Sequence, residues 1–309
     1  MSTFRNPYKV EGRWYKGNTH IHSNKSDGGL SIGKLCELYA ERGYHFLCIT
    51  DHWKEAGKEV EDAFDGKKIA LIKGVEIGGV QGVTAKDGTK KKFASDVIGL
   101  YLKRGGIVEQ DYHLSLKGLG ENDAYLIICH PFFSGDTVER LSELNHFQAI
   151  EIYNHVAMDI NYRGYSIELW DALLAKGIGI WGIAADDAHI NDYLPYYDGA
   201  WIVVKSRECR APEIIRSLRR GSFYSSQGPE IYEIDLENDT LIIRCSPVRK
   251  VVIYGDGKSR GVVLDPGNRA MAKWKLSLSD IIRECTKYFR IELKDENGKT
   301  AWTNPFFKK

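Results

Sequence analysis

Nearly continuous apolar runs alternate with amphipathic stretches over the first two thirds of the chain, and this alternation limits the possible folds. The apolar runs occupy residues 45–52, 69–77, 96–102, 124–131, 149–154 and 178–189. Strands buried on both faces of a parallel sheet are apolar throughout, whereas half-exposed strands alternate apolar and polar residues. Stretches of helical periodicity separate the runs at residues 31–44, 136–145, 165–177 and 211–221. A strand–helix repeat over ~220 residues predicts an α/β fold, either layered or closed into a barrel.

The amphipathic stretch at residues 31–44 carries both end signals of a helix. Ser31 is a suitable N-cap because its hydroxyl can accept a hydrogen bond from a free backbone N–H of the first turn. Gly43 is a suitable residue for the end of the helix. We therefore expect a helix between these two residues.

The pattern changes after residue 225. From Tyr232 onward the runs alternate apolar and polar residues, and turn signals such as ENDT, YGDGKS, DPGN and DENGK recur. The closing segment KYFRIELKDENGKTAWTNPFF predicts two strands around an Asn-Gly turn. The sequence thus predicts an α/β domain at residues 1–225 and a small all-β domain at residues 226–309.

Composition places the chain among ordinary globular proteins. Its formal net charge is +1, with 43% hydrophobic and 28% charged residues, so no long-range field attracts nucleic acid or an anionic membrane. The segment MSTFRNPYKVEGRW lacks the apolar core of a signal peptide, and no run approaches the ~18 apolar residues of a membrane span. The six cysteines show no CxxC spacing. We expect a cytoplasmic protein with a small-molecule substrate, no nucleic acid polymer or membrane as partner, and an undetermined oligomeric state.

Histidines and acids stand where the predicted strands end. His20 and His22 are two residues apart, a spacing that points both side chains to one face of a strand. The complete set of strand-end donors is His20, His22, Asp27, His52, Glu76, His130, Asp187 and His189.

These donors predict a metal centre. The carboxyl ends of barrel strands meet on one face, where converging acids and imidazoles would repel one another or stay unsatisfied without cations. Eight nitrogen and oxygen donors are too many for one tetrahedral zinc, so we expect two or three divalent ions with Glu76 as a bridging carboxylate. The absence of cysteine from these ends favours Zn, Mn or Fe.

Neighbouring polar residues have alternative roles. Asp51 is expected to orient His52 as a hydrogen-bond acceptor, and Asp186 is either a ligand or the partner of its neighbour. Glu151 and Asn154 could support ligands or contact substrate. His155 is a candidate proton donor or a surface residue at a helix start, and Arg163 is either a phosphate clamp or solvent-facing.

The motifs THIHSNKSDG, ITDH, GVE, CHP and DAH resemble, in order and spacing, those of the PHP (polymerase and histidinol phosphatase) metal-dependent phosphoesterases, over roughly residues 15–225. The resemblance implies a distorted seven-stranded β/α barrel with a two- or three-metal centre. It implies one site made by His20, His22, Glu76 and Asp187, a second shared by Glu76 and His130, and a third made by Asp27, His52 and His189. Asp96 stands where many members have a histidine, and we expect it as a harder ligand of the second site.

Segments outside these motifs are similar to one branch of the family. GRWYKGNTHIHS, GSFYSSQGPEI and FRIELKDENGKTAWTNPFF resemble carbaryl hydrolase-like metallohydrolases, in which a β-sandwich follows the barrel. This resemblance implies a C-terminal β-sandwich and leaves the substrate open.

The main functional hypothesis is a phosphoesterase that cleaves a small phosphate mono- or diester with a metal-bridging hydroxide. Glu76 would bridge the ions, and His189 acting through water, or His155, would protonate the leaving oxygen. Two alternatives remain at this point: a metallohydrolase of carbon esters, amides or carbamates, and a non-catalytic, metal-stabilised binding module.

Overall fold

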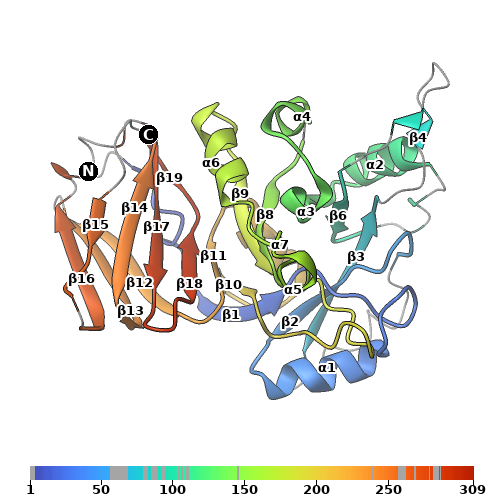
Figure 1. The fold of residues 1–309 in the computed structure, drawn as a ribbon, viewed down its shortest axis with the longest axis horizontal. Coiled ribbons are helices and arrows are strands. Elements are labelled where there is room, and N and C mark those ends of the chain that lie inside the picture. The colour runs from blue at the N-terminus through green and yellow to red at the C-terminus, as the bar shows by residue number, and fades with distance from the viewer. Residues whose placement is uncertain are drawn as a thin grey trace.

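A computed structural model describes residues 4–55, 69–78, 83–84, 90–91, 95–103, 105, 107–108, 111–144, 146–237, 240–256, 262–267, 269–277, 279–280, 285 and 287–309. A mixed α/β part and a strand-rich part lie side by side, and both termini lie at the strand-rich end (Figure 1). Among the described residues, one sheet of 14 strands runs through both parts, and sheets of three and two strands accompany it. None of the described helices is both long and apolar enough to cross a bilayer.

Strands of the α/β part form the half of the large sheet that carries the donors. They are β1 (Arg13–Asn18), β2 (Phe46–Ile49), β3 (Ala70–Ile77), β6 (Val97–Leu100), β7 (Tyr125–Ile128), β8 (Ala149–Asn154), β9 (Trp181–Ala185) and β10 (Trp201–Ser206). β1, β2 and β3 are parallel neighbours, and so are β7, β8 and β9. The expected parallel arrangement is confirmed for these two sets.

The expectation of a parallel strand is wrong for β6. It runs antiparallel to both β3 and β7. An antiparallel neighbour needs no helical crossover, and the described residues between β3 and β6 form only the short antiparallel pair β4 (Val83–Thr84) and β5 (Lys90–Lys91). Because β6 is reversed, its start lies at the rim where the parallel strands end, which brings Asp96 to that rim.

The described residues of the α/β part form seven helices, four of them in the predicted stretches at residues 31–44, 136–145, 165–177 and 211–221 and three in segments outside the predicted stretches. They are α1 (Ile32–Glu41), α2 (Tyr112–Glu121), α3 (Pro131–Ser134), α4 (Val138–Glu143), α5 (His155–Asn161), α6 (Ile167–Ala175) and α7 (Ala211–Arg219). The Ser31 side chain caps α1 by accepting from Lys34 N, as predicted. Gly43 follows the helix with a φ of 75°, a left-handed conformation that favours glycine.

The strand-rich part continues the large sheet beyond β10. Its strands are β11 (Phe223–Ser226), β12 (Ile231–Glu237), β13 (Thr240–Val248), β14 (Lys250–Gly255), β15 (Val262–Leu264), β16 (Met271–Ser277), β17 (Tyr288–Lys294), β18 (Thr300–Thr303) and β19 (Phe306–Phe307). β12, β13 and β16 form the separate three-stranded sheet. One apolar cluster joins Ile243 and Trp274 of that sheet to Val251 and Ile291 of the large sheet. The predicted hairpin is confirmed, because β17 and β18 pair antiparallel around the Asn-Gly turn.

Ser225 links β11 to the last parallel strand of the α/β part. Ala184 N donates to Ser225 Oγ, which donates to Gly182 O, both at 2.9 Å. The predicted domain boundary between residues 225 and 226 lies inside β11, whose sheet continues on both sides. That boundary, the closed seven-stranded barrel and the separate sandwich stay predictions.

Arg290 joins the strand-rich part to α6. It lies on β17 with 1% of its surface exposed, and its Nε and Nη2 donate to the Asp171 carboxylate of α6 at 2.7 and 2.6 Å. Its Nη1 donates to Glu292 at 2.6 Å. Removing the guanidinium would leave Glu292 buried without its partner, which is strongly destabilising.

We predict that R290A lowers the free energy of unfolding by about 3–5 kcal/mol, measured by urea denaturation. The control is R244A, because Arg244 pairs with Glu233 where both side chains are about half exposed. That change should cost no more than about 1 kcal/mol. Equal effects of the two substitutions would contradict the role of Arg290.

Candidate metal centre

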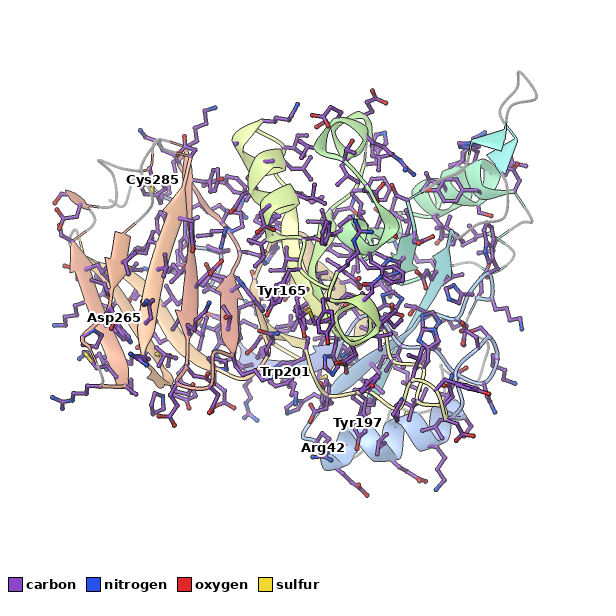
Figure 2. All side chains as sticks on the ribbon, in the orientation of Figure 1. Arg42, Tyr165, Tyr197, Trp201, Asp265 and Cys285 are labelled. Atoms are coloured by element: carbon purple, nitrogen blue, oxygen red, sulfur yellow. The ribbon has the colours of Figure 1, made fainter. Side chains whose placement is uncertain are left out.

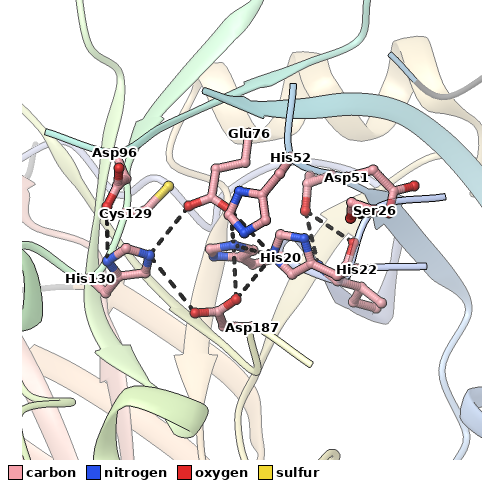
Figure 3. A network of polar contacts seen from close by, with 12 residues as sticks. His20, His22, Ser26, Asp51, His52, Glu76, Asp96, Cys129, His130 and Asp187 are labelled. Carbon is pink, nitrogen blue, oxygen red and sulfur yellow. Dashed lines mark hydrogen bonds and ion pairs between the residues drawn. The ribbon is translucent and has the colours of Figure 1, made fainter. Parts of the chain in front are cut away.

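The predicted donors lie close together at one rim of the large sheet, and Figure 3 labels all of them except Asp27 and His189. His20 and His22 follow β1, His52 follows β2, and Glu76 lies near the end of β3. His130 follows β7, while Asp187 and His189 follow β9. Among the described residues, four groups place possible ligand atoms within 4.8 Å of one another, and three of these groups consist of predicted ligands alone.

The most buried group consists of His20, His22, Glu76 and Asp187. The Nε2 atoms of His20 and His22 lie 3.1 Å apart. Glu76 Oε2 lies 3.0 Å from His20 Nε2, and Asp187 Oδ1 lies 3.1 Å from His22 Nε2. Two imidazole nitrogens facing each other beside two carboxylates form a donor set suited to a divalent cation.

A second group consists of Glu76, Asp96 and His130. Glu76 Oε1 lies 3.3 Å from His130 Nε2, so the two oxygens of Glu76 face different groups. Asp96 Oδ2 lies 3.8 Å from His130 Nδ1. Gly78 makes room for Asp96, because a Cβ at this position would lie 1.9 Å from Asp96 Oδ1.

A third, more exposed group consists of His22, Asp27, His52 and His189. Asp27 Oδ2 lies 3.2 Å from His189 Nε2 and 3.6 Å from His52 Nε2. The His22 ring stacks on both His52 and His189, with centroids 4.4 and 4.3 Å apart. His22 belongs to two groups, because its Nε2 faces Asp187 in the first group and its Nδ1 faces Asp27 in the third.

An unpaired nitrogen tests whether metal fits these residues. His22 is fully buried, and its Nδ1 has no hydrogen-bond partner among the described residues. Asp27 Oδ1 is 3.7 Å away, which is too long for a hydrogen bond. Buried polar atoms rarely lack a partner, so a cation between His22 and Asp27 would give His22 Nδ1 the partner it lacks. The residues fit divalent metal.

Without metal, protons balance the acids of the centre. Burial lowers the pKa of His22, but hydrogen bonds with Asp187 and Glu76 outweigh burial and raise this pKa to about 9. Burial is likewise outweighed at His130, where the hydrogen bond with Glu76 raises the pKa to about 9. Burial opposes ionisation of Glu76, but the charge of His20 and hydrogen bonds from the histidines hold its pKa well below its usual range.

Glu151 supports the centre from behind. It is fully buried on β8, and its Oε1 lies 2.8 Å from His20 Nδ1. Its Oε2 accepts from His130 N at 2.8 Å and from Asn154 Nδ2 at 2.9 Å. A carboxylate on the far nitrogen of a ligating imidazole fixes the ring's orientation. These contacts favour the supporting one of the two roles predicted for Glu151.

The expectation that Asp51 orients His52 is wrong. Asp51 Oδ1 accepts from Ser23 N and from Ser26 Oγ, and Oδ2 accepts from Ser23 Oγ, each at 2.7 Å. These donors lie in the loop between His22 and Asp27 (Figure 3). The carboxylate holds that loop because it offers three well-placed donors.

Cys129 corrects the expectation that no cysteine stands at the strand ends. It directly precedes His130, and its Sγ lies within 4.8 Å of donor atoms of His20 and Glu151. Burial raises the pKa of its thiol well above the usual value, so it is a neutral thiol. The sequence offers one signal for this position, because Cys129 directly precedes the predicted ligand His130.

Two other candidates lie outside the ligand groups of the described residues. His155 begins α5, with Nε2 3.4 Å from Asp159 Oδ2 and Nδ1 3.4 Å from Tyr153 OH. Its catalytic role stays a prediction. The Arg163 guanidinium lies 4.5 Å from the centre of the Phe132 ring, and its role as a phosphate clamp also stays a prediction.

Backbone strain gathers at this rim. His130 and Asp187 have φ values of 26° and 58°, and Trp53 and Ile190 beside other ligands have 54° and 41°. Such conformations are costly for residues other than glycine and persist only where the surroundings impose them, most often at functional sites. Side-chain patterns in the sequence carry no signal for this feature.

We predict that metal uptake releases protons. With pKa values of about 9, His22 and His130 are protonated at pH 7 in the metal-free protein, whereas metal ligation requires neutral imidazole. Apparent affinity should therefore rise with pH up to about 9, by up to about tenfold per pH unit for each proton displaced. Calorimetric titration in two buffers of different ionisation enthalpy counts the protons. Uptake without proton release would contradict the assignment.

Comparison with known proteins identifies part of the chain. Residues 18–165 match the family model described as PHP domain. The match ends before Asp187 and His189.

Among curated proteins, the DNA polymerase/3′-5′ exonuclease PolX of Bacillus subtilis is 27% identical over 203 residues, which cover 56% of this chain. The chain spans only 34% of that relative. Because that relative acts on DNA by name, the expectation that nucleic acid is no partner is unsupported.

Two solved structures are similar at low identity. One is a two-domain protein from Bacteroides vulgatus containing a predicted PHP-like metal-dependent phosphoesterase, 13% identical, with 98% of this chain and 99% of that chain covered and a TM-score of 0.48. The other is an amidohydrolase from Chromobacterium violaceum with bound sulfate and no metal, 14% identical, with coverages of 65% and 95% and a TM-score of 0.43. Because both TM-scores are below 0.5, the fold is described from the strands of this chain alone.

Proposed function

Because residues 18–165 of this chain belong to the PHP domain family, we propose that the protein is a metal-dependent hydrolase that cleaves a small phosphate mono- or diester. The observation that carries the proposal is the position of Glu76. Its Oε2 lies 3.0 Å from His20 Nε2 and its Oε1 lies 3.3 Å from His130 Nε2, so one carboxylate can serve two ions. Ions that share a carboxylate are close enough to hold one phosphate group.

The ligand groups support the following assignment. One ion would be held by His20, His22, Glu76 and Asp187, a second by Glu76, Asp96 and His130, and a third by Asp27, His52 and His189, with His22 Nδ1 also facing Asp27. The nitrogen and oxygen donors suit Zn, Mn or Fe. When bound, such ions polarise a phosphate oxygen and lower the pKa of a coordinated water.

Residues of the chain orient these donors and deliver a proton. Glu151 keeps the His20 ring in place, and Asp51 holds the loop that carries Asp27. We assign protonation of the leaving oxygen to a water molecule that His189 orients, because the Nδ1 proton of His189 is held by Asp187 O and its Nε2 would ligate an ion. His189 Nδ1 is 2.8 Å from Asp187 O, and the His189 side chain is 12% exposed, which gives it access to solvent. His155 is the alternative donor.

The finer architecture is part of the same proposal. We assign residues 1–225 to a distorted seven-stranded β/α barrel and residues 226–309 to a β-sandwich of the kind found in the carbaryl hydrolase-like branch. The two facing sheets around Ile243 and Val251 support the second assignment.

We predict that protein purified without chelator contains metal and hydrolyses p-nitrophenyl phosphate or its bis-ester when supplied with Mn, Zn or Fe. H22A and E76Q should lower kcat/KM by about 100-fold or more, because each removes a donor shared by two ligand groups. H113A is the matched control, since His113 lies exposed on α2. Mass spectrometry of bound metal and the hydrolysis assay are the measurements.

Other outcomes separate the alternatives. Turnover of aryl esters or carbamates with inert phosphate esters would replace the phosphoesterase by a carbon-ester hydrolase. Cleavage of a short DNA strand alone would reassign the substrate to nucleic acid. Stoichiometric metal without turnover of any of these would indicate a binding module.

A further inference from the structure

Asp186 is a fully buried carboxylate directly before the ligand Asp187. It accepts five hydrogen bonds. Its Oδ2 accepts from Asn18 Nδ2 at 2.8 Å, from Tyr39 OH at 2.8 Å and from Asp198 N at 2.9 Å. Its Oδ1 accepts from the backbone N–H groups of residues 199 and 200, both at 2.9 Å. These bonds use the full acceptor capacity of a carboxylate.

The five donors come from three separate segments. Asn18 ends β1 and stands two residues before His20. Tyr39 lies on α1, and residues 198–200 close the loop that leads from β9 to β10. The Asp186 carboxylate, at the start of the β9–β10 loop, thus connects β1 and α1 to the end of the same loop.

That loop supplies ligands to two different groups. Asp187 belongs to the group with His20 and Glu76, whereas His189 belongs to the group with Asp27 and His52. Asp187 has a φ of 58°, a conformation that its surroundings must hold in place. The direction of both ligand side chains therefore depends on how the loop is anchored.

Two side chains near the end of the β9–β10 loop, those of Tyr197 and Asp198, make further contacts. Arg42 Nη2 donates to Tyr197 OH at 3.2 Å, near Trp201 (Figure 2). The Asp198 side chain pairs with Lys16 at 2.9 Å and meets Asp186 only through its backbone N–H. Asp198 therefore also joins the loop to β1, but through a partly exposed ion pair with Lys16 and not through the buried bonds that Asp186 makes to Asn18 and Tyr39.

We propose that Asp186 is a positioning residue that sets Asp187 and His189 together, so that one buried carboxylate controls two of the metal groups. The inference rests on the proposed metal centre. Asparagine at this position keeps the size of the side chain but replaces an acceptor oxygen by an NH₂ donor. In either orientation of the amide that donor would face backbone N–H groups, of Asp198 or of residues 199 and 200, and the loop would have to shift.

Cobalt(II) is the probe, because its visible absorption reports the ligands and the geometry of each bound ion. D186N should bind cobalt about 10–100-fold more weakly, the loss typical of residues that orient ligands. D187N and H189N serve as references, because each should alter the cobalt absorption of one ligand group. The D186N spectrum should show both of these alterations. D198N is the matched control and should keep the affinity and spectrum of the unsubstituted protein.

A second variant and a stability measurement separate positioning from folding. Y39F removes one of the five donors and should weaken cobalt binding in the same direction but less. Melting temperatures measured with chelator show whether D186N is folded, and if it is not, Y39F decides. An unchanged cobalt affinity in folded D186N, or in Y39F, would overturn the proposal, as would an equal loss in D198N. Cobalt binding that depends on Asp186 in a protein inert toward phosphate esters would refute the proposed function and leave this inference standing.

Discussion

The burial of Glu76 among imidazoles is the interaction on which the rest of this structure depends. The side chain is 1% exposed and contacts His20, His22, His52 and His130 at 3.0–3.3 Å. A buried carboxylate without partners would cost several kcal/mol, so the sheet must bring histidines from three strand ends to one point. In the metal-free centre protonated histidines neutralise the carboxylate. In the proposed enzyme divalent ions would neutralise it.

Three further buried acids make this convergence possible without facing the ions. Glu151 holds His20 and the backbone at His130, Asp51 holds the loop after His22, and Asp186 holds the loop after β9. Each accepts several hydrogen bonds from donors that would otherwise be buried and unpaired. The rim therefore consists of loops, each held by hydrogen bonds to its own buried carboxylate. These hydrogen bonds keep the backbone at His130 and Asp187 in its strained conformation.

Much of the centre could be predicted from the sequence, because its ligands obey local rules. The spacing of His20 and His22 places two imidazoles on one face, and His52, His130 and Asp187 each stand one to three residues after the last apolar residue of an apolar run. A run of this kind predicts a strand, and the residues just after it are predicted to lie at the rim.

The remainder depends on contacts between distant segments. Glu151 meets His20 across 131 residues, and Asp51 meets Ser23 across 28. An apolar run is also the same in either strand direction, so the reversal of β6, which turns Asp96 toward the rim, leaves no mark in its own residues. The continuity of the large sheet through β11 was hidden for a related reason, since a change in residue pattern at residue 226 does not end a sheet.

Anomalous X-ray diffraction from crystals of the manganese- or zinc-loaded protein would show whether Glu76 bridges two ions. We expect anomalous peaks in at least two of the ligand groups, with each oxygen of Glu76 about 2.0–2.2 Å from a different ion. Peaks only at other positions, or a Glu76 carboxylate that contacts no ion in fully loaded crystals, would contradict this expectation.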